Sequence, residues 1–370
     1  MNQFITNKFY DTINSLTKYD ISDIHIMQDK DIYIRKADWV VVPVKWFVLA
    51  SEEIYWFLHG ILSDKEVELL MEGEEIDCSY EIWWYRFRIN AYQTSAWINM
   101  ALRKIVSKPQ SMEEIGFSPE LRDRIIKKNK WLILVTWSTG SWKSTSLASM
   151  INELNDNRNC HIITLEDPIE FVYENNKALV NQREIGKHSK SWINAIKYSL
   201  RQDPDVVMVW EMRDYETISA VLTLVETWHL VLSTLHTSDA VQTVNRIIDA
   251  SPANRKSQIS SQLSLALDVI VSQCLIKKAD GKWRVPAREV MINTSAISNN
   301  IREWNLAQMH GIIETWMKYG MNTLDQSIAR LVVSGQVNLN DSLSYIRNVN
   351  SFKNLLAHYK KQNEWFKPVD

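Results

Sequence analysis

The segment Trp137–Ser144 reads WSTGSWKS and places a lysine beside a hydroxyl side chain. It follows the apolar run Leu132–Val135 and precedes a helical pattern over Thr145–Leu154. A strand, a loop carrying Lys-Ser and a helix are typical of the phosphate-binding motif GxxxxGK(S/T). In that motif backbone N–H groups hold the phosphates, the lysine contacts the β- and γ-oxygens, and the hydroxyl binds Mg²⁺. The segment therefore predicts a site for ATP with Mg²⁺.

The predicted nucleotide contacts on this loop come from consecutive residues, namely Ser138, Thr139, Gly140, Ser141, Trp142, Lys143, Ser144 and Thr145. Lys143 is also assigned to catalysis and Ser144 to the metal. Both glycine positions of the motif are tryptophan, Trp137 and Trp142. Where glycine is required next to a phosphate, an indole has little room. As written, the loop would be broken; a chance strand, turn and helix is the alternative, which the next segments argue against.

Acidic and imidazole side chains follow three further apolar runs. The segment Thr164–Glu170 carries three carboxylates at a predicted strand end, where they could bind Mg²⁺ through water or polarise an attacking water, or form a solvated loop. The run Asp205–Glu211 delivers Glu211 to the same edge of a sheet. His229 and His236 flank the strand Leu230–Thr234, close enough to sense a γ-phosphate unless they are structural. Together, in this order, these segments predict an ATP-hydrolysing protein.

The elements that must position these residues fall into two patterns. Short strands are predicted at 24–26, 32–35, 40–42 and 85–89, a helix at 52–70, and a polar linker at 107–111. Beyond it, buried runs at 132–135, 162–163, 206–209 and 230–232 alternate with helices, which is typical of a largely parallel sheet. From about Ala253 to the end the pattern is helical.

Composition excludes several classes of protein. The chain has 370 residues, long enough for two or three domains, and its 42 Lys+Arg and 44 Asp+Glu leave a net charge of -2. With no basic field, we expect no nucleic-acid partner. Cys78, Cys160 and Cys274 form no CxxC pair, which argues against a zinc site or disulfides and favours a cytoplasmic setting. No run approaches the roughly 20 apolar residues of a membrane helix.

Five segments together resemble the secretion ATPase family, which drives type II secretion and type IV pili, and most closely its pilus retraction (twitching motility) motors. These are Ser22–His25 (SDIH), Glu166–Glu170 (an Asp box), Arg201–Asp205 with Glu211–Asp214 (a Walker B region), Thr234–Thr237 (a His box) and Ala296–Glu303. The last is similar to the AIRNLIRE segment of retraction motors, from which Ser298 and Asn300 depart. The resemblance covers nearly the whole chain.

The resemblance implies an α/β fold: an N-terminal PAS-like α+β domain (1–108), a RecA-like P-loop ATPase core (109–290) and a helical C-terminal portion (291–370). It implies that Glu170 positions or activates the attacking water and that Glu211 supports Mg²⁺ and its water shell. His229 and His236 would contact the nucleotide-sensing network. Arg88 and Arg103 resemble the arginines that reach the γ-phosphate and stabilise charge in phosphoryl transfer, although surface arginines are the alternative.

The resemblance further implies a homo-hexamer at the cytoplasmic face of the inner membrane, with an inner-membrane platform protein and a second paralogous ATPase as partners. Its function would be pilus retraction powered by ATP hydrolysis. Assembly and type II secretion motors are the alternatives, but they carry an extra N-terminal domain and a four-cysteine zinc site that this sequence does not show. A catalytically inactive P-loop subunit is the other alternative if Trp137 and Trp142 are genuine.

Tryptophan is abundant and glycine scarce, with 16 Trp and 9 Gly in the chain. Their sum, 16 + 9 = 25 of 370, is near the average glycine usage of roughly 7%. Besides the loop, tryptophan stands where the family pattern has glycine or a turn at Trp39, Trp46, Trp83, Trp84, Trp131, Trp210, Trp228 and Trp316. Trp56, Trp192 and Trp365 have no glycine counterpart. We hypothesise that the gene uses a codon, UGA, that its host reads as glycine.

Overall fold

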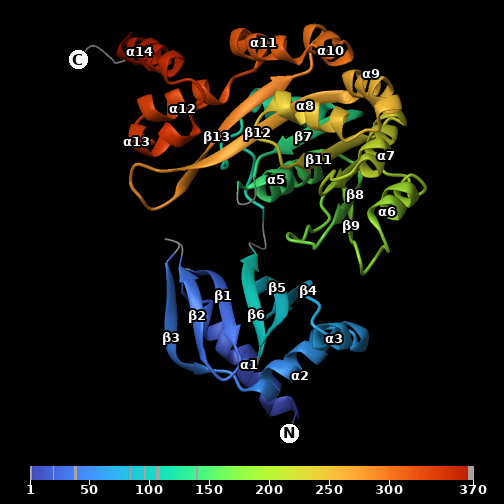
Figure 1. Cartoon of the computed structure of the whole chain (residues 1–370), viewed down its shortest axis with the longest axis vertical. Coiled ribbons are helices and arrows are strands. Elements are labelled where there is room, and N and C mark those ends of the chain that lie inside the picture. Colours follow the sequence, from blue (N-terminus) through green and yellow to red (C-terminus); the bar gives the residue numbers. More distant parts are fainter. Residues whose placement is uncertain are drawn as a thin grey trace. The chain divides into compact units, whose positions relative to one another are not determined.

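The computed structural model describes residues 2–19, 21–36, 40–83, 85–95, 97–105, 109–138 and 141–365. Four residues named above, Trp39, Trp84, Thr139 and Gly140, lie outside the described residues. The chain divides into two compact units (Figure 1). The first comprises Met1–Lys108 with Pro168–Val172, and the second comprises Pro109–Asp167 with Tyr173–Asp370.

The first unit is built on a six-stranded antiparallel sheet of order β3-β2-β1-β6-β5-β4. Its strands are β1 (Ile21–Met27), β2 (Asp31–Lys36), β3 (Val41–Val48), β4 (Ile76–Ile82), β5 (Tyr85–Thr94) and β6 (Trp97–Ile105). Its helices are α1 (Asn2–Leu16), α2 (Ser51–Ile61) and α3 (Asp64–Met71). The four strands expected from alternation are confirmed as β1, β2, β3 and β5.

A single helix over 52–70 is wrong, because the chain breaks between α2 and α3. The Ser63 hydroxyl accepts the backbone N–H of Glu66, whose carboxylate accepts the N–H of Ser63 in return. This reciprocal capping box starts a new helix at Asp64. Both helices belong to the unit's core, where the rings of Phe9 and Phe57 stack with centroids 3.9 Å apart.

The second unit contains a seven-stranded sheet of order β13-β12-β7-β11-β10-β8-β9. Its strands are β7 (Trp131–Thr136), β8 (His161–Glu166), β9 (Leu179–Glu184), β10 (Val206–Val209), β11 (Leu230–Leu235), β12 (Leu267–Lys277) and β13 (Arg284–Ile292). All neighbours are parallel except β12 and β13. The four expected buried runs are confirmed as β7, β8, β10 and β11, and they are buried on both faces as parallel strands require.

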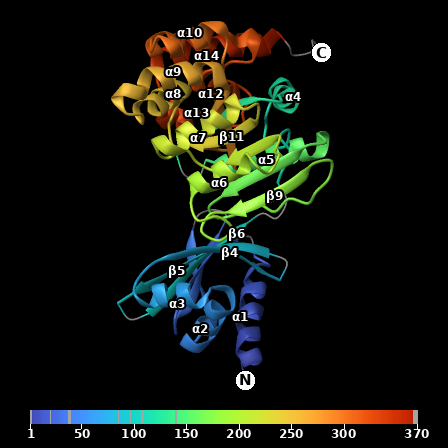
Figure 2. The same ribbon diagram turned by 90° about the vertical axis from the view of Figure 1, so that its right-hand side faces the viewer.

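Helices cover both faces of this sheet (Figures 1 and 2). They are α4 (Pro119–Lys127), α5 (Lys143–Asn157), α6 (Trp192–Ser199), α7 (Tyr215–Glu226), α8 (Ala240–Asp249) and α9 (Lys256–Ala266), with the 3₁₀ turn η1 (Ala253–Arg255). The crossover from β7 to β8 runs one way along the sheet, whereas those from β9 to β10 and from β10 to β11 run back. Right-handed connections therefore place α5 opposite α6 and α7. The contacts agree, since α4 packs on α5, whereas α6 packs on α7 and α7 on α9.

A helical pattern from Ala253 onward is wrong for 267–292, where β12 and β13 pair antiparallel over nine residue pairs. All of β12 except Lys277 and the last six residues of β13 are buried, and a continuous apolar run does not distinguish a buried strand from a buried helix. The helices after them are α10 (Ser295–Arg302), α11 (Met309–Thr315), α12 (Leu324–Val333), α13 (Leu339–Ser342) and α14 (Val349–Trp365), with η2 (Leu306–Gln308), η3 (Met317–Tyr319) and η4 (Leu343–Tyr345). No helix among the described residues is long and apolar enough to cross a bilayer.

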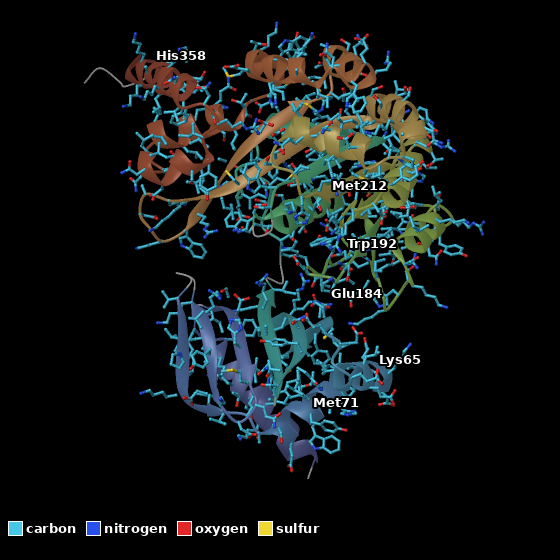
Figure 3. All side chains as sticks on the ribbon, viewed as in Figure 1. Lys65, Met71, Glu184, Trp192, Met212 and His358 are labelled. Atoms are coloured by element: carbon cyan, nitrogen blue, oxygen red, sulfur yellow. The ribbon has the colours of Figure 1, made fainter. Side chains whose placement is uncertain are left out.

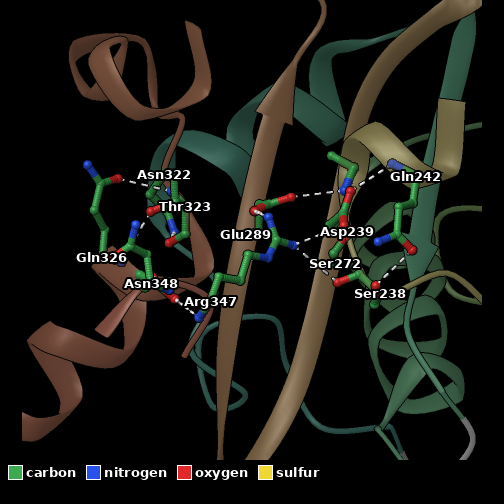
Figure 4. A network of polar contacts seen from close by, with 12 residues as sticks. Ser238, Asp239, Gln242, Ser272, Glu289, Asn322, Thr323, Gln326, Arg347 and Asn348 are labelled. Carbon is green, nitrogen blue, oxygen red and sulfur yellow. Dashed lines mark hydrogen bonds and ion pairs between the residues drawn. The ribbon is translucent and has the colours of Figure 1, made fainter. Parts of the chain in front are cut away.

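Arg347 ties this C-terminal segment to the sheet (Figure 4). Its guanidinium lies 3.3 Å from Asp239 and 3.2 Å from Glu289, and Glu289 is completely buried in β13. Asp239 caps α8, and the other Glu289 oxygen accepts the N–H of Ala240 at 2.9 Å. The backbone N–H of Arg347 donates in turn to Asp325 of α12. Burial raises the pKa of Glu289, and the charge of Arg347 opposes that rise.

Candidate functional site

The loop between β7 and α5, residues 137–144, holds the ammonium group of Lys143. Lys143 is the first residue of α5, and its Nζ donates to the backbone carbonyls of Trp137 at 2.5 Å and Ser138 at 3.2 Å. Burial lowers the pKa of Lys143 to about 8, although the charge of Glu211 acts in the opposite direction. The lysine side chain therefore folds back onto the first two residues of its own loop.

His236 and Glu211 complete a chain of polar contacts with Lys143. Nδ1 of His236 lies 3.4 Å from Lys143 Nζ, and its Nε2 lies 3.3 Å from a Glu211 oxygen. The other Glu211 oxygen accepts from Nε of Arg213 at 2.9 Å. Burial and the charge of Lys143 lower the pKa of His236, so the ring is favoured in its neutral form despite Glu211. A neutral imidazole between an ammonium and a carboxylate can accept from one and donate to the other.

These three side chains meet because β7, β10 and β11 are neighbours and parallel. Lys143 follows β7, Glu211 follows β10, and His236 follows β11 directly. Carboxyl ends of parallel strands lie at one edge of a sheet, which is where ligands bind in open α/β folds. Met212, labelled in Figure 3, fixes the turn after Glu211, since its N–H donates to the carbonyl of Thr234 at 3.1 Å.

Gln273 supports the loop from beneath, and sequence reasoning missed it. Its Nε2 donates to the carbonyl of Ser141 at 2.7 Å, and its Oε1 accepts from the hydroxyl of Ser146 at 2.9 Å. Arg288 donates to the same Oε1 at 3.1 Å. A glutamine in the apolar run of β12 is the signal that could have found it, because a buried amide must find partners.

Arg288 extends this network to the segment that begins the second unit. Its two terminal nitrogens donate to the carbonyls of Ile115 at 2.7 Å and Gly116 at 2.8 Å, and its plane lies 4.0 Å from the ring centroid of Phe117. Burial lowers the pKa of Arg288 to about 9, which still leaves the guanidinium charged at neutral pH. One unbroken series of hydrogen bonds thus runs from Ser141 in the loop to Ile115.

His229 does not belong to this site. It precedes β11, whereas His236 follows it, and its carbonyl accepts the N–H of Trp131 at the start of β7. A strand of this length separates the two edges by roughly 20 Å. The ring of His229 instead contacts the carbonyl of Leu224 at 2.9 Å, at the end of α7. Within this chain His229 therefore lies at the opposite edge of the sheet from His236, and its contact with a nucleotide stays a prediction.

The remaining predicted residues are found in other surroundings. Glu166 is buried at the end of β8, where it accepts from Thr164 and Gln182. Glu170, Arg88 and Arg103 belong to the first unit, in which Arg88 lies 3.5 Å from Glu170 and Arg103 lies 2.8 Å from Asp23. Ser144 and Thr145 lie in the first turn of α5, and both are half-buried.

A cavity of about 480 Å³ opens beside the loop in the second unit. Its lining includes Trp137, Asp239, His310, Tyr345 and Arg347. The described residues contain no cluster of three or more His, Cys, Asp or Glu side chains that could hold a metal by themselves. Side chains of these types would thus supply only part of the coordination of a divalent cation, and phosphate oxygens can supply the rest.

A model of the type II/IV secretion system protein family matches residues 70–356. The chain belongs to this family. It is 42% identical over 321 residues to the type IV pilus retraction ATPase PilT of Pseudomonas aeruginosa, covering 86% of this chain and 92% of the relative. It is 41% identical over 290 residues to a twitching motility protein of Neisseria gonorrhoeae, covering 78% and 77%.

The fold of this family member is also found in a solved structure. The pilus retraction motor PilT with bound ADP superimposes with a TM-score of 0.85 and 34% sequence identity, covering 93% of this chain and 98% of that one. The matched residues include sequence from both units of the chain. The α/β architecture expected from the sequence is thereby confirmed.

Proposed function

We propose that the chain is an ATP-hydrolysing motor that retracts type IV pili. The observation that carries this proposal is the meeting of Lys143, His236 and Glu211 at the carboxyl edge of the sheet, in a chain that matches a retraction ATPase over nearly its whole length. In this proposal the second unit is a RecA-like P-loop ATPase and the first a PAS-like domain. The 137–144 loop holds the triphosphate of ATP.

In this site Lys143 would exchange two loop carbonyls for the β- and γ-phosphates. That exchange is favourable because anionic oxygens replace neutral acceptors around a partly desolvated ammonium. The hydroxyl of Ser144 and the carboxylate of Glu211, partly through water, are the hard oxygen donors that suit Mg²⁺ alongside phosphates. The bound cation would neutralise charge that develops on the phosphates. His236, linking Lys143 to Glu211, is placed to respond when either contact changes.

Three residues of the first unit would complete catalysis. We assign Glu170 to the attacking water, and Arg88 and Arg103 to the charge that develops on the γ-phosphate. In the structure these arginines are paired with carboxylates, Arg88 with Asp77 and Arg103 with Asp23. Engagement of the nucleotide would therefore require each arginine to leave an acidic partner.

The same proposal assigns the chain to a homo-hexamer that works at the cytoplasmic face of the inner membrane. A platform protein in that membrane and a second paralogous ATPase are its proposed partners. The relatives named above support retraction, because the chain covers 92% of the retraction ATPase. A pilus assembly or type II secretion motor is the alternative.

Hydrolysis is tested on purified protein with glycine at positions 137 and 142, because these are the two glycine positions of the phosphate-binding motif. Lys143→Ala should lower the turnover number by at least about 100-fold, as expected when one donor to a developing charge is lost. Lys127→Ala is the matched control, since Lys127 is exposed and pairs only with Asp123 one turn away. Equal activity in all three proteins would refute an ATPase at this loop.

The direction of movement is tested by deleting the gene. Retraction predicts that pili remain on the surface while twitching motility stops. Loss of surface pili would instead identify an assembly motor. Secretion defects with normal pili would identify a type II secretion motor.

A further inference from the structure

Tryptophan dominates the residues whose backbone is left-handed. Among the described residues, eight that are not glycine have positive φ, and six of them are tryptophan. They are Trp83 (57°), Trp131 (144°), Trp137 (146°), Trp142 (61°), Trp228 (72°) and Trp304 (55°), and the other two are Asp29 and Asp203. Aspartate tolerates this region, whereas a bulky side chain there is a genuine outlier. Only glycine adopts it without a steric penalty.

The end of α7 shows what each such position requires. Thr227 is the C-cap, so Trp228 is the first residue beyond the helix. Its N–H donates to the carbonyl of Val225 at 3.1 Å, and the N–H of His229 donates to Leu224 at 3.3 Å. These two hydrogen bonds define a Schellman motif, in which the residue at this position is left-handed and usually glycine.

The end of α10 repeats the arrangement. Trp304 follows the C-cap Glu303, its N–H donates to Ile301 at 3.2 Å, and the N–H of Asn305 donates to Asn300 at 2.9 Å. The sequence pattern did not single out Trp304.

Two other helices provide an internal control, because they end with the same pair of hydrogen bonds and carry glycine. At the end of α3 the residue is Gly73, with φ of 100°. At the end of α12 it is Gly335, with φ of 72°. The chain thus uses glycine and tryptophan interchangeably at one stereochemical position.

A hairpin makes the same demand in the first unit. Ile82 of β4 pairs with Tyr85 of β5, so the loop between them has two residues, the first being Trp83. Two-residue hairpin loops favour turns with left-handed residues, for which glycine is preferred. Trp142 is similar, since it has φ of 61° and ψ of 28° at the N-cap of α5.

We propose that glycine occupies positions 83, 131, 137, 142, 228 and 304 of the synthesised protein, because its gene carries UGA there and the host decodes UGA as glycine. UGA differs by one base both from the tryptophan codon UGG and from the glycine codon GGA, so a single change of reading exchanges the two residues. The shared stereochemistry of unrelated turns requires one common cause. The proposal restores both motif glycines of the 137–144 loop.

The structure also sorts the other tryptophans. Trp192 is the first residue of α6 and packs against the core of the second unit, so we infer that it is genuine (Figure 3). Trp210 and Trp316 were suspected from the sequence, but their backbone is not left-handed and does not demand glycine.

The direct test is peptide mass spectrometry of the protein isolated from its own cells, with the gene sequenced in parallel. We expect glycine in the peptides that contain positions 137, 142, 228 and 304, with UGA at each codon, and tryptophan with UGG at position 192. Tryptophan at position 228 or 304 in the native peptide would overturn the proposal. The result does not depend on ATP hydrolysis, so it stands or fails separately from the proposed function.

Thermal stability gives a second test, on the protein expressed with tryptophan at all of these positions. Trp228→Gly and Trp304→Gly should each raise the melting temperature, by about 3 °C per site, because backbone strain is relieved. Trp228 is 73% exposed and Trp304 46%, so little packing is lost. Trp192→Gly is the control and should lower the melting temperature. A fall at positions 228 and 304 would mean that the indoles belong there.

Nucleotide binding gives the functional readout. The chain with glycine at positions 137 and 142 should bind a non-hydrolysable ATP analogue at least about 10-fold more tightly than the written chain, since backbone N–H groups can then approach the phosphates. Equal affinity would count against glycine in the loop.

Discussion

The charged ammonium of Lys143 is partly desolvated in the folded chain. It is held by two carbonyls and partly withdrawn from water, which is why its pKa falls to about 8. A lysine whose pKa is lower in the folded chain than in the unfolded chain binds its proton less tightly when folded. In the window between the two values, the unfolded chain holds more protons, so the free energy of unfolding rises with pH.

We predict this rise in the nucleotide-free protein between about pH 8 and the ordinary pKa of lysine. It should be absent from Lys143→Met, which cannot titrate. It should also shrink when an ATP analogue is bound, because the phosphates stabilise the ammonium. Urea unfolding at a series of pH values checks the prediction, and parallel curves for the original protein and the variant would contradict it.

The residues of the site were predictable from sequence where a local pattern specifies them. Lys143 and Glu211 follow strands in recognisable segments, and their meeting follows from a parallel sheet. His229 was grouped with His236 because both flank one strand, but a strand presents its two flanking residues at opposite edges of the sheet. Gln273 and Arg288 lie far from the loop in sequence, and only the pairing of β12 with β7 and β13 brings them together.

At the scale of elements, β12 and β13 act as the base on which the loop rests. Gln273→Leu would leave the carbonyl of Ser141 and the hydroxyl of Ser146 without their buried partner. We expect a loss of about 2–4 kcal/mol in the free energy of unfolding, together with weaker nucleotide binding. Urea unfolding and analogue titration provide the measurement. Gln336→Leu, at an exposed position, serves as the control and should change neither quantity.

The ion pair between Arg347 of the C-terminal segment and Glu289 of β13 leads to a separate prediction. Arg347→Met removes the positive charge beside buried Glu289 and should cost about 3–5 kcal/mol at neutral pH. The pKa of Glu289, already raised by burial, would then rise further, so the variant gains stability as its carboxyl is protonated at lower pH.

The deficit of Arg347→Met should therefore be smaller at about pH 5 than at about pH 8. Adding Glu289→Gln should recover part of it, since the buried charge of Glu289 is then removed, while Asp239 still lacks its partner. A deficit that is the same at both pH values, and in the double variant, would show that Arg347 acts through packing alone.

Elements were predictable where their periodicity was distinct. Four strands of the first unit and four buried parallel strands of the second were recognised, whereas β4, β6 and β9 were not predicted. The failure at β12 has a physical reason, because ten of its eleven residues are buried and no alternation remains to mark a strand. The break between α2 and α3 depends on one capping box at Ser63.

At the scale of the whole molecule, the main hydrophobic core of each unit is separate from that of the other. Phe57 belongs to the core of the first unit and Leu232 to that of the second. Chains with several cores commonly depart from two-state unfolding. Calorimetry should therefore resolve two transitions. Phe57→Ala should affect only the transition of the first unit, lowering its free energy of unfolding by about 3–5 kcal/mol. Leu232→Ala should affect only that of the second unit, by about 2–5 kcal/mol. A single transition shifted by both variants would contradict this expectation.

Arg288 has a mechanical consequence for a chain that exerts force. Tension entering the second unit at Pro109 would travel along the backbone to Ile115 and Gly116, whose carbonyls are held by one buried guanidinium. Arg288 lies in β13, and its guanidinium is also bonded to Gln273 of β12. The force would then pass from the backbone at Ile115 and Gly116 through Arg288 into the sheet. The next group along this series of hydrogen bonds would be the carbonyl of Ser141 in the nucleotide loop, which accepts from Gln273.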